Sequence, residues 1–148
     1  MDIEDYYFKK SEIPYTNARS RGECADLMLA DIEKYRSFVI SAVDGDFGDK
    51  ISSFYKLAVF VSAPIDLRLK RIKQRVQDKY GKRICRGGDM YKRHLEFIDF
   101  VASRDLTKMD NWAQTLTCPV LYIDGQEDWH ANAAYIAKQA EKLQIGKK

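Results

Sequence analysis

The sequence lacks several features that would assign it to a class of protein at once. No apolar run approaches the roughly 18 residues of a membrane-spanning helix, so no membrane partner is expected. The net charge of +3 is too small to indicate nucleic-acid binding by itself. The cysteines are scattered and form no CxxC pair. Reduced thiols in a cytoplasmic protein are therefore expected at Cys24, Cys85 and Cys118.

Common constellations of catalytic side chains are also missing. His94 and His130 are isolated, so no cluster has the spacing of metal ligands. His94 lies on an apolar helical stripe, which predicts a hydrogen-bonded histidine at the edge of a core. No serine occupies a nucleophile elbow. The loop at 44–49, Asp-Gly-Asp-Phe-Gly-Asp, does not fit the phosphate-loop motif G-x-x-x-x-G-K-[ST], because only two residues separate its glycines.

The composition is that of a globular domain, with 45% hydrophobic and 32% charged residues. No repeat or linker divides the chain, so one domain over 1–148 is expected. Continuous apolar runs rich in β-branched residues predict buried strands at 37–42, 57–62 and 119–125. Residues 1–7 predict a weaker fourth strand.

Helical patterns lie between these strands. Apolar residues at helical spacing predict helices over 24–35, from Pro64 to near Gly81, over 91–101 and over 133–143. Strands that alternate with helices of this length predict an α/β protein. The expected fold is a three-layer parallel sheet of about four strands with helices on both faces.

Acidic residues follow the predicted strands, where a parallel sheet binds its ligands. Asp5 could accept a proton from a substrate hydroxyl or hold Mg²⁺ through water, although an acidic, frayed terminus is the simpler interpretation. Asp44 could face a substrate or contact a metal. Tyr7 could stack on a base, although aromatic residues more often serve packing.

Basic residues gather on the helix after Pro64 and in the loop that follows it. Arg68, Arg71 and Arg75 share one side of that helix, and Arg86 lies in the glycine-containing loop. Guanidinium groups bind phosphate oxygens bidentately, and the flanking glycines would let the loop close over a nucleotide. The alternative is a solvated basic flank whose long side chains lie over the core edge. Both interpretations stay open.

Together these segments resemble a known family. Residues 60–75 resemble the strand, turn and basic helix of P-loop nucleoside and nucleotide kinases of the adenylate-kinase-like group, and of AAA-type ATP-binding proteins. Residues 86–91 and 118–125 resemble the helix start after the lid and the last strand, and residues 2–7 resemble the acidic end of the second strand. The order and spacing of the segments, from residue 2 to about 139, carry the resemblance more than any one motif.

The resemblance implies transfer of the γ-phosphate of ATP, held with Mg²⁺, to a nucleoside- or nucleotide-type acceptor. Asp5 would then face the acceptor, and Arg71 and Arg75 would bind phosphate from the lid side as catalytic residues. Asp44 and Arg68 would contact the substrate. The complete set of candidate substrate-binding residues is Tyr7, Asp44, Arg68 and Arg86. The lid-like basic segment covers about residues 78–90.

The first strand and phosphate loop of that family are absent from the sequence. Their absence would leave buried strand edges unpaired, which is too costly to persist. Either the strands at 37–42 and 57–62 pair directly, or a second chain fills the gap, or the natural protein starts upstream of Met1. We expect a truncated kinase-like domain that binds ATP weakly or not at all.

Other functions remain open. The main alternative is a non-catalytic module that forms a homodimer through an exposed strand edge. Nucleic acid is the least favoured partner of the basic segment 68–93, because acidic loops would line the same end of the sheet.

Overall fold

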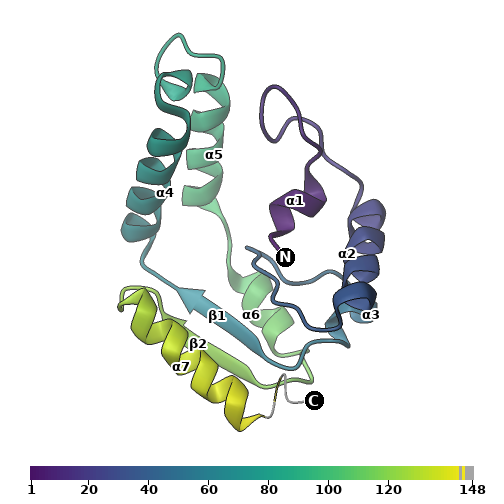
Figure 1. The fold of residues 1–148 in the computed structure, drawn as a ribbon. Helices are drawn as coiled ribbons and strands as arrows, with labels where there is room; N and C mark the ends of the chain where they lie inside the picture. The colour runs from purple at the N-terminus through teal and green to yellow at the C-terminus, as the bar shows by residue number, and fades with distance from the viewer. Residues whose placement is uncertain (144, 146–148) are drawn as a thin grey trace. The chain divides into compact units, whose positions relative to one another are not determined.

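A computed structural model describes residues 1–143 and residue 145. It divides into two compact units, each described below by itself. The first unit contains Met1–Ala58, Met109–Val120 and the residues from Gln139 on, and the second contains Val59–Lys108 and Leu121–Lys138. Figure 1 shows the elements along the chain. The expectation of a single domain stays a prediction.

The first unit is built around helix α2, Arg21–Tyr35. The helix begins with a capping box, in which the Ser20 hydroxyl accepts from the Glu23 N–H and the Glu23 carboxylate accepts from the Ser20 N–H. Helix α2 contains the whole of the predicted range 24–35 and confirms that prediction. A cluster of buried residues surrounds α2, which contributes Cys24, Met28 and Ile32 at helical spacing. The other members of the cluster are Ile3, Phe47 and Ile51.

Two of the predicted strands are wrong. Residues 1–7 instead form helix α1, Ile3–Tyr7, because the Asp2 carboxylate caps the Glu4 N–H and acidic side chains favour a first helical turn. Residues 37–42 form no strand, although Ser41 forms an isolated parallel bridge with Asp2. Val39 in this segment is 81% exposed. The β-branched residues of the segment therefore do not form the continuous buried strand that the sequence indicates.

The two other predicted strands are confirmed as β1, Ala58–Ser62, and β2, Val120–Asp124, which pair with each other. The Ala58 N–H donates to the Pro119 carbonyl at 3.0 Å, and the Gly125 N–H donates to the Ser62 carbonyl at 2.6 Å. Residue numbers therefore rise together along both strands, so the pair is parallel. Within the described part of the chain the sheet has these two strands, and the larger sheet of about four strands stays a prediction.

The remaining predicted helices are present. The second unit holds α4, Ile65–Tyr80, the 3-10 helix η1, Gly81–Ile84, and α5, Tyr91–Ser103, and Figure 1 shows α4 and α5 side by side. Helix α7, Trp129–Lys142, includes most of the predicted range 133–143. Two short helices were not predicted with bounds: α3, Asp49–Ser52, and α6, Thr107–Ala113.

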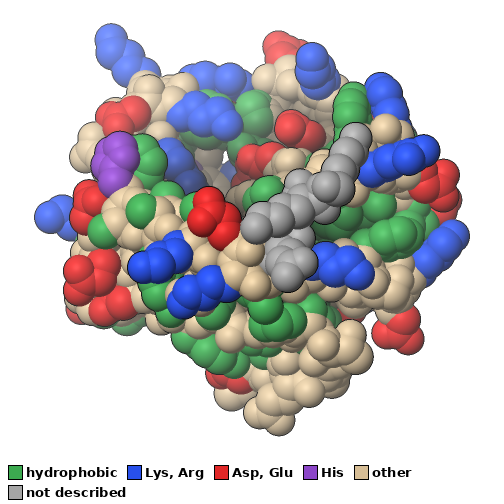
Figure 2. Space-filling model, turned by 60° about the horizontal axis from the view of Figure 1, so that its bottom comes forward, with side chains coloured by type: hydrophobic (Ala, Val, Ile, Leu, Met, Phe, Trp, Pro, Cys, Tyr) green, Lys and Arg blue, Asp and Glu red, His purple; other side chains and the backbone are tan. Residues whose placement is uncertain are grey.

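Two of the expectations from the sequence concern membrane-spanning helices and the state of the cysteines. Across residues 1–143 and 145, no helix has both the length and the apolar character needed to cross a bilayer. Cys24 is buried, Cys85 is exposed and Cys118 is half-buried, and all three are free thiols. Figure 2 shows basic and acidic side chains both present across the face that it draws, with apolar side chains between them.

Candidate functional site

The carboxyl ends of β1 and β2 meet a guanidinium group from α4. The Arg71 Nη1 atom donates to the Gly125 carbonyl oxygen at 2.7 Å, across 54 residues of sequence. Gly125 lies directly after β2, and a Cβ atom there would lie 2.9 Å from the Ser62 carbonyl oxygen. Only glycine lets the two strand ends approach this closely. The hydrogen bond from Arg71 to Gly125 therefore fixes Arg71 at the edge where parallel sheets bind ligands.

A cavity of about 300 Å³ opens at this same edge. Its wall comes from Ser62 at the end of β1, from Ala63 and Pro64 after it, and from Asp124 and its neighbours at the end of β2. The Asp124 carboxylate accepts from the Gln126 N–H at 2.8 Å, which holds the turn after β2. Ser62 and Asp124 were not among the predicted site residues, although their places at strand ends were a sequence signal for both.

The other arginines of α4 share the side of the helix that carries Arg71. At about 100° per residue, the three positions fall within roughly 60° of one another. Arg75 is exposed, while the Arg68 Nε atom is buried and has no hydrogen-bond partner. Within the described chain neither of these two arginines forms an ion pair. The structure therefore brings the predicted residues Arg68, Arg71 and Arg75 together on one helical face.

The predicted lid-like segment contains the end of α4, the 3-10 helix η1 and a loop whose residues bond to one another. The Arg83 guanidinium contacts both carboxylate oxygens of Asp89, with the closest pair 2.6 Å apart. That hydrogen bonding is the main cause of a lowered pKa for Asp89. The Met90 N–H donates to the Arg83 carbonyl at 2.9 Å, which closes the loop. Arg86 lies exposed in the turn between these contacts.

The first unit brings together the predicted residues Tyr7 and Asp44. Burial is the main cause of a raised pKa for Tyr7, the Cys24 thiol adds to it, and Asp44 and Asp46 act in the same direction. The Asp44 carboxylate accepts from the Asp46 N–H at 3.0 Å, so it also stabilises its own turn. The positive charge of Arg21 acts in the opposite direction and lowers the pKa of Tyr7. The Arg21 Nη2 atom also donates to the Asp46 carbonyl at 2.7 Å.

Asp5 lies on α1 in the same unit, and its carboxylate is exposed. The backbone around it is held by Arg19, a residue that the sequence analysis missed. The Arg19 Nη1 atom lies 3.1 Å from the Asp5 carbonyl, 2.9 Å from the Tyr6 carbonyl and 3.2 Å from the Phe8 carbonyl. These bonds satisfy carbonyl groups at the end of α1 that have no partner inside the helix. Arg19 therefore orients the segment that presents Asp5 and Tyr7.

Two groups of predicted site residues result. Asp5, Tyr7 and Asp44 belong to the first unit. The second unit carries the predicted arginines, Arg68, Arg71, Arg75 and Arg86. For Mg²⁺, the described residues contain no group of three or more His, Cys, Asp and Glu side chains that could hold a metal ion.

A hydrogen bond between α1 and α2 gives the first unit a pH dependence. The Tyr6 hydroxyl donates to the Asp31 carboxylate at 2.6 Å. Burial first, and then this bond, raise the pKa of Tyr6 to about 12. A pKa raised in the folded state means that the stabilisation is complete below the unfolded value of about 10. It is lost as the pH rises toward 12.

We therefore expect Tyr6→Phe to lower the free energy of unfolding by about 1 kcal/mol below pH 10 or so. The variant should lose less stability than the parent chain as the solution is made more alkaline. Thermal unfolding followed by circular dichroism over this range measures both effects. Tyr55, whose pKa burial also raises to about 12, and Tyr7, whose pKa is also raised, are unchanged in the variant and contribute to the residual slope. Identical alkaline slopes in the two proteins would contradict the assignment.

The chain is similar to a known bacterial protein over most of its length. No family model matches the chain, and no solved structure matches it. The chain is similar to the protein named "Uncharacterized protein YqaC" of Bacillus subtilis (strain 168), with 28% identity over 137 residues. The similarity covers 84% of this chain and 72% of that protein. It extends over both units and carries no statement of activity.

Proposed function

We propose that this chain carries the acceptor-binding and phosphate-closing part of a cytoplasmic small-molecule kinase. Such an enzyme transfers the γ-phosphate of ATP to a nucleoside- or nucleotide-type acceptor. One observation carries the proposal: Arg71 is bonded to the Gly125 carbonyl at 2.7 Å, directly after a parallel strand. A guanidinium group at that edge suits a phosphate-bearing ligand in both position and charge.

The arginine face of α4 supplies the proposed phosphate contacts. One nitrogen of Arg71 is used by Gly125, which orients the group while its remaining N–H groups can bind phosphate oxygens. Arg75 lies one helical turn further along the same side, and Arg68 lies one turn before. Arg86 adds a positive charge from the loop after η1. A phosphoryl group bound here would have its negative charge offset by several guanidinium groups.

The acceptor-side roles fall to residues of the first unit. Tyr7, whose pKa is raised further by burial, can donate a hydrogen bond from its hydroxyl or stack its ring on the substrate. Asp44 and Asp5 offer carboxylate oxygens to a substrate hydroxyl. The proposed substrate is accordingly a small hydroxyl compound or a phosphate-bearing one.

ATP and Mg²⁺ do not fit the residues at hand. The sequence contains no phosphate-loop motif, and the part of the chain that the structure describes offers no metal-binding group. The proposal therefore assigns these residues no step that involves the donor nucleotide. It gives residues 1–148 a weak affinity for ATP that depends on the arginine face.

Arg71→Gln is expected to weaken binding of tripolyphosphate about tenfold, the effect of losing one charge-assisted hydrogen-bonding group. Calorimetric titration of residues 1–148 measures the change. Arg71→Lys, which keeps the charge but not the planar fork, should recover only part of the affinity. Lys138→Gln on α7 is the matched control, because it removes one charge from an exposed position outside the site.

Equal losses in Arg71→Gln and Lys138→Gln would show a general effect of net charge and would contradict the proposal. Micromolar affinity for ATP in the parent chain would contradict the weak ATP binding that we expect.

A dimerising module is the second candidate, and the sheet favours it. Among the described residues, β1 and β2 pair only with each other, so each has one edge without a strand partner. Val61 and Tyr122 are 64% and 67% exposed. Light scattering on the same samples separates the candidates, since a tight dimer that does not bind tripolyphosphate would favour the module.

A further inference from the structure

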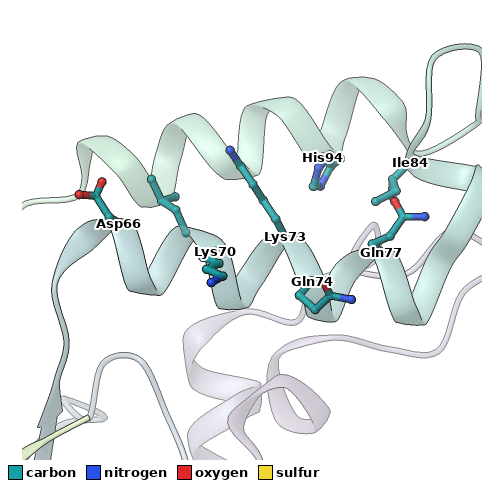
Figure 3. A pocket seen from close by; sticks show the side chains of 8 residues that line it. Asp66, Lys70, Lys73, Gln74, Gln77, Ile84 and His94 are labelled. Carbon is teal, nitrogen blue, oxygen red and sulfur yellow. The ribbon is translucent and has the colours of Figure 1, made fainter. Parts of the chain in front are cut away.

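A second cavity lies within the second unit, in the groove between α4 and α5. Its volume is about 650 Å³. Figure 3 shows its lining, which comes mainly from α4, with Ile84 from η1 and His94 from α5. The volume falls in the usual range of sites for small ligands. This groove is separate from the cavity at the ends of the strands.

The groove faces a different side of α4 from the arginines. At about 100° per residue, Lys70 and Lys73 lie roughly 60° apart, on the groove side. Lys73 lies roughly 160° around the helix from Arg71 by the same geometry. A ligand bound in the groove would therefore not touch the arginine face that the proposed kinase function uses.

Positive charge lines the groove without compensation by ion pairs. Neither Lys70 nor Lys73 forms an ion pair with any residue that the structure describes. In Figure 3 the Lys73 side chain extends from α4 toward α5. Asp66 is the carboxylate in the lining. Two ammonium groups against one carboxylate leave the groove with a net positive charge when His94 is neutral.

A buried polar atom also points to a missing partner. The His94 Nδ1 atom is buried and makes no hydrogen bond, which corrects the expectation of a hydrogen-bonded histidine at the core edge. Leaving such an atom unpaired costs about 1–3 kcal/mol, and unpaired buried atoms in native proteins call for an explanation. Beside it, Leu69 and Ile84 give the groove an apolar surface. A ligand with both a polar group and an apolar body would satisfy each part.

We propose that the groove binds a small phosphate monoester with a ring as its apolar body. The phosphate group lies between the ammonium groups of Lys70 and Lys73, and the ring packs on Leu69, one helical turn before Lys73. A polar atom of the ligand pairs with His94 Nδ1. A dianionic phosphate has enough oxygens to contact both lysines at once, and it carries twice the charge of a monoanionic carboxylate.

Phenyl phosphate is the probe, titrated into residues 1–148 and followed by NMR of the backbone amides. Shifts are expected at Leu69, Lys73, Gln77, Ile84 and His94. Phenyl phosphate should bind several-fold more tightly than inorganic phosphate, because burial of the ring adds apolar contact. Benzyl alcohol, which has the ring without the charge, should bind more weakly than phenyl phosphate.

Lys73→Gln should weaken phenyl phosphate binding about tenfold, as expected for a charge-assisted hydrogen bond. The charge control Lys138→Gln should change it little. His94→Phe keeps the ring volume and removes both nitrogens, and should weaken binding several-fold. The amide spectra of the variants verify that each remains folded.

Arg71→Gln separates this site from the proposed kinase site, since it should lower the affinity for tripolyphosphate but not for phenyl phosphate. A loss of phenyl phosphate affinity in Arg71→Gln would place the ligand at the strand ends and would contradict the proposal that it binds in the groove. Equal losses in Lys73→Gln and Lys138→Gln, or equal affinities for phenyl phosphate and inorganic phosphate, would also overturn it.

Discussion

Met28→Ala is expected to lower the free energy of unfolding of the chain by about 2–5 kcal/mol. Met28 is 0% exposed and belongs to the buried cluster of the first unit. Truncation removes the transfer free energy of the side chain and leaves a cavity, because α2 is held at its start by the capping box at Ser20 and cannot easily shift to fill it. Urea unfolding followed by circular dichroism measures the loss.

Leu27→Ala is the matched control for this prediction. Leu27 precedes Met28 on the same helix and is 43% exposed. Its truncation removes a similar volume and keeps a good helix former, so a loss below about 1 kcal/mol is expected. If both variants lost the same stability, the cluster around Met28 would not be the core of the unit.

Met28→Ala also tests how the residues proposed to bind the acceptor are positioned. Tyr7 packs against the buried cluster that contains Met28. A cavity in the cluster would loosen this contact and let water reach the phenol, so the raised pKa of Tyr7 should move back toward its ordinary value. The positioning of Tyr7 thus depends on the packing of a core residue that touches no ligand in the proposal.

The longer helices could be predicted because their signals are local. Apolar residues at helical spacing indicated the helix over 24–35, and Pro64 and Gly81 flank α4. The strands at 57–62 and 119–125 could be predicted because they have each other as partners. Residues 37–42 have the same apolar composition, but composition alone does not supply the partner strands that a buried strand requires. That part of the fold depends on long-range pairing, which the pattern of one segment does not contain.

Part of the candidate site could also be predicted from the sequence, and part of it required the structure. Helical spacing alone placed the three arginines of α4 on one side. The bond from Arg71 to Gly125 joins residues far apart in the sequence, so it required the structure. The pairing of Arg83 with Asp89 also required it, because a basic, glycine-containing segment does not reveal which charge is neutralised within the loop. The groove at His94 was missed because an apolar stripe does not show whether a ring nitrogen has a partner.

Gly88→Ala is expected to destabilise the second unit by about 3 kcal/mol, at the upper end of the range for overpacking. A Cβ atom at this position would lie 2.6 Å from the Lys82 carbonyl oxygen and would also clash with the Arg83 carbonyl. Both are backbone atoms of η1, so no side chain can rotate away to make room. Relief of the clash must move η1 away from the start of α5. Such a movement would strain the contact between Arg83 and Asp89.

Gly87→Ala separates this steric effect from ordinary backbone strain. Gly87 has a φ of 87° and would place its Cβ atom in open space, so the expected loss is that of a positive φ alone, about 1–2 kcal/mol. Urea unfolding ranks the two variants. Phenyl phosphate titration then tests the link to the groove, because Ile84 at the end of η1 lines it and should be displaced only in Gly88→Ala. Equal stability and equal affinity in the two variants would show that η1 and α5 are not in close contact at Gly88.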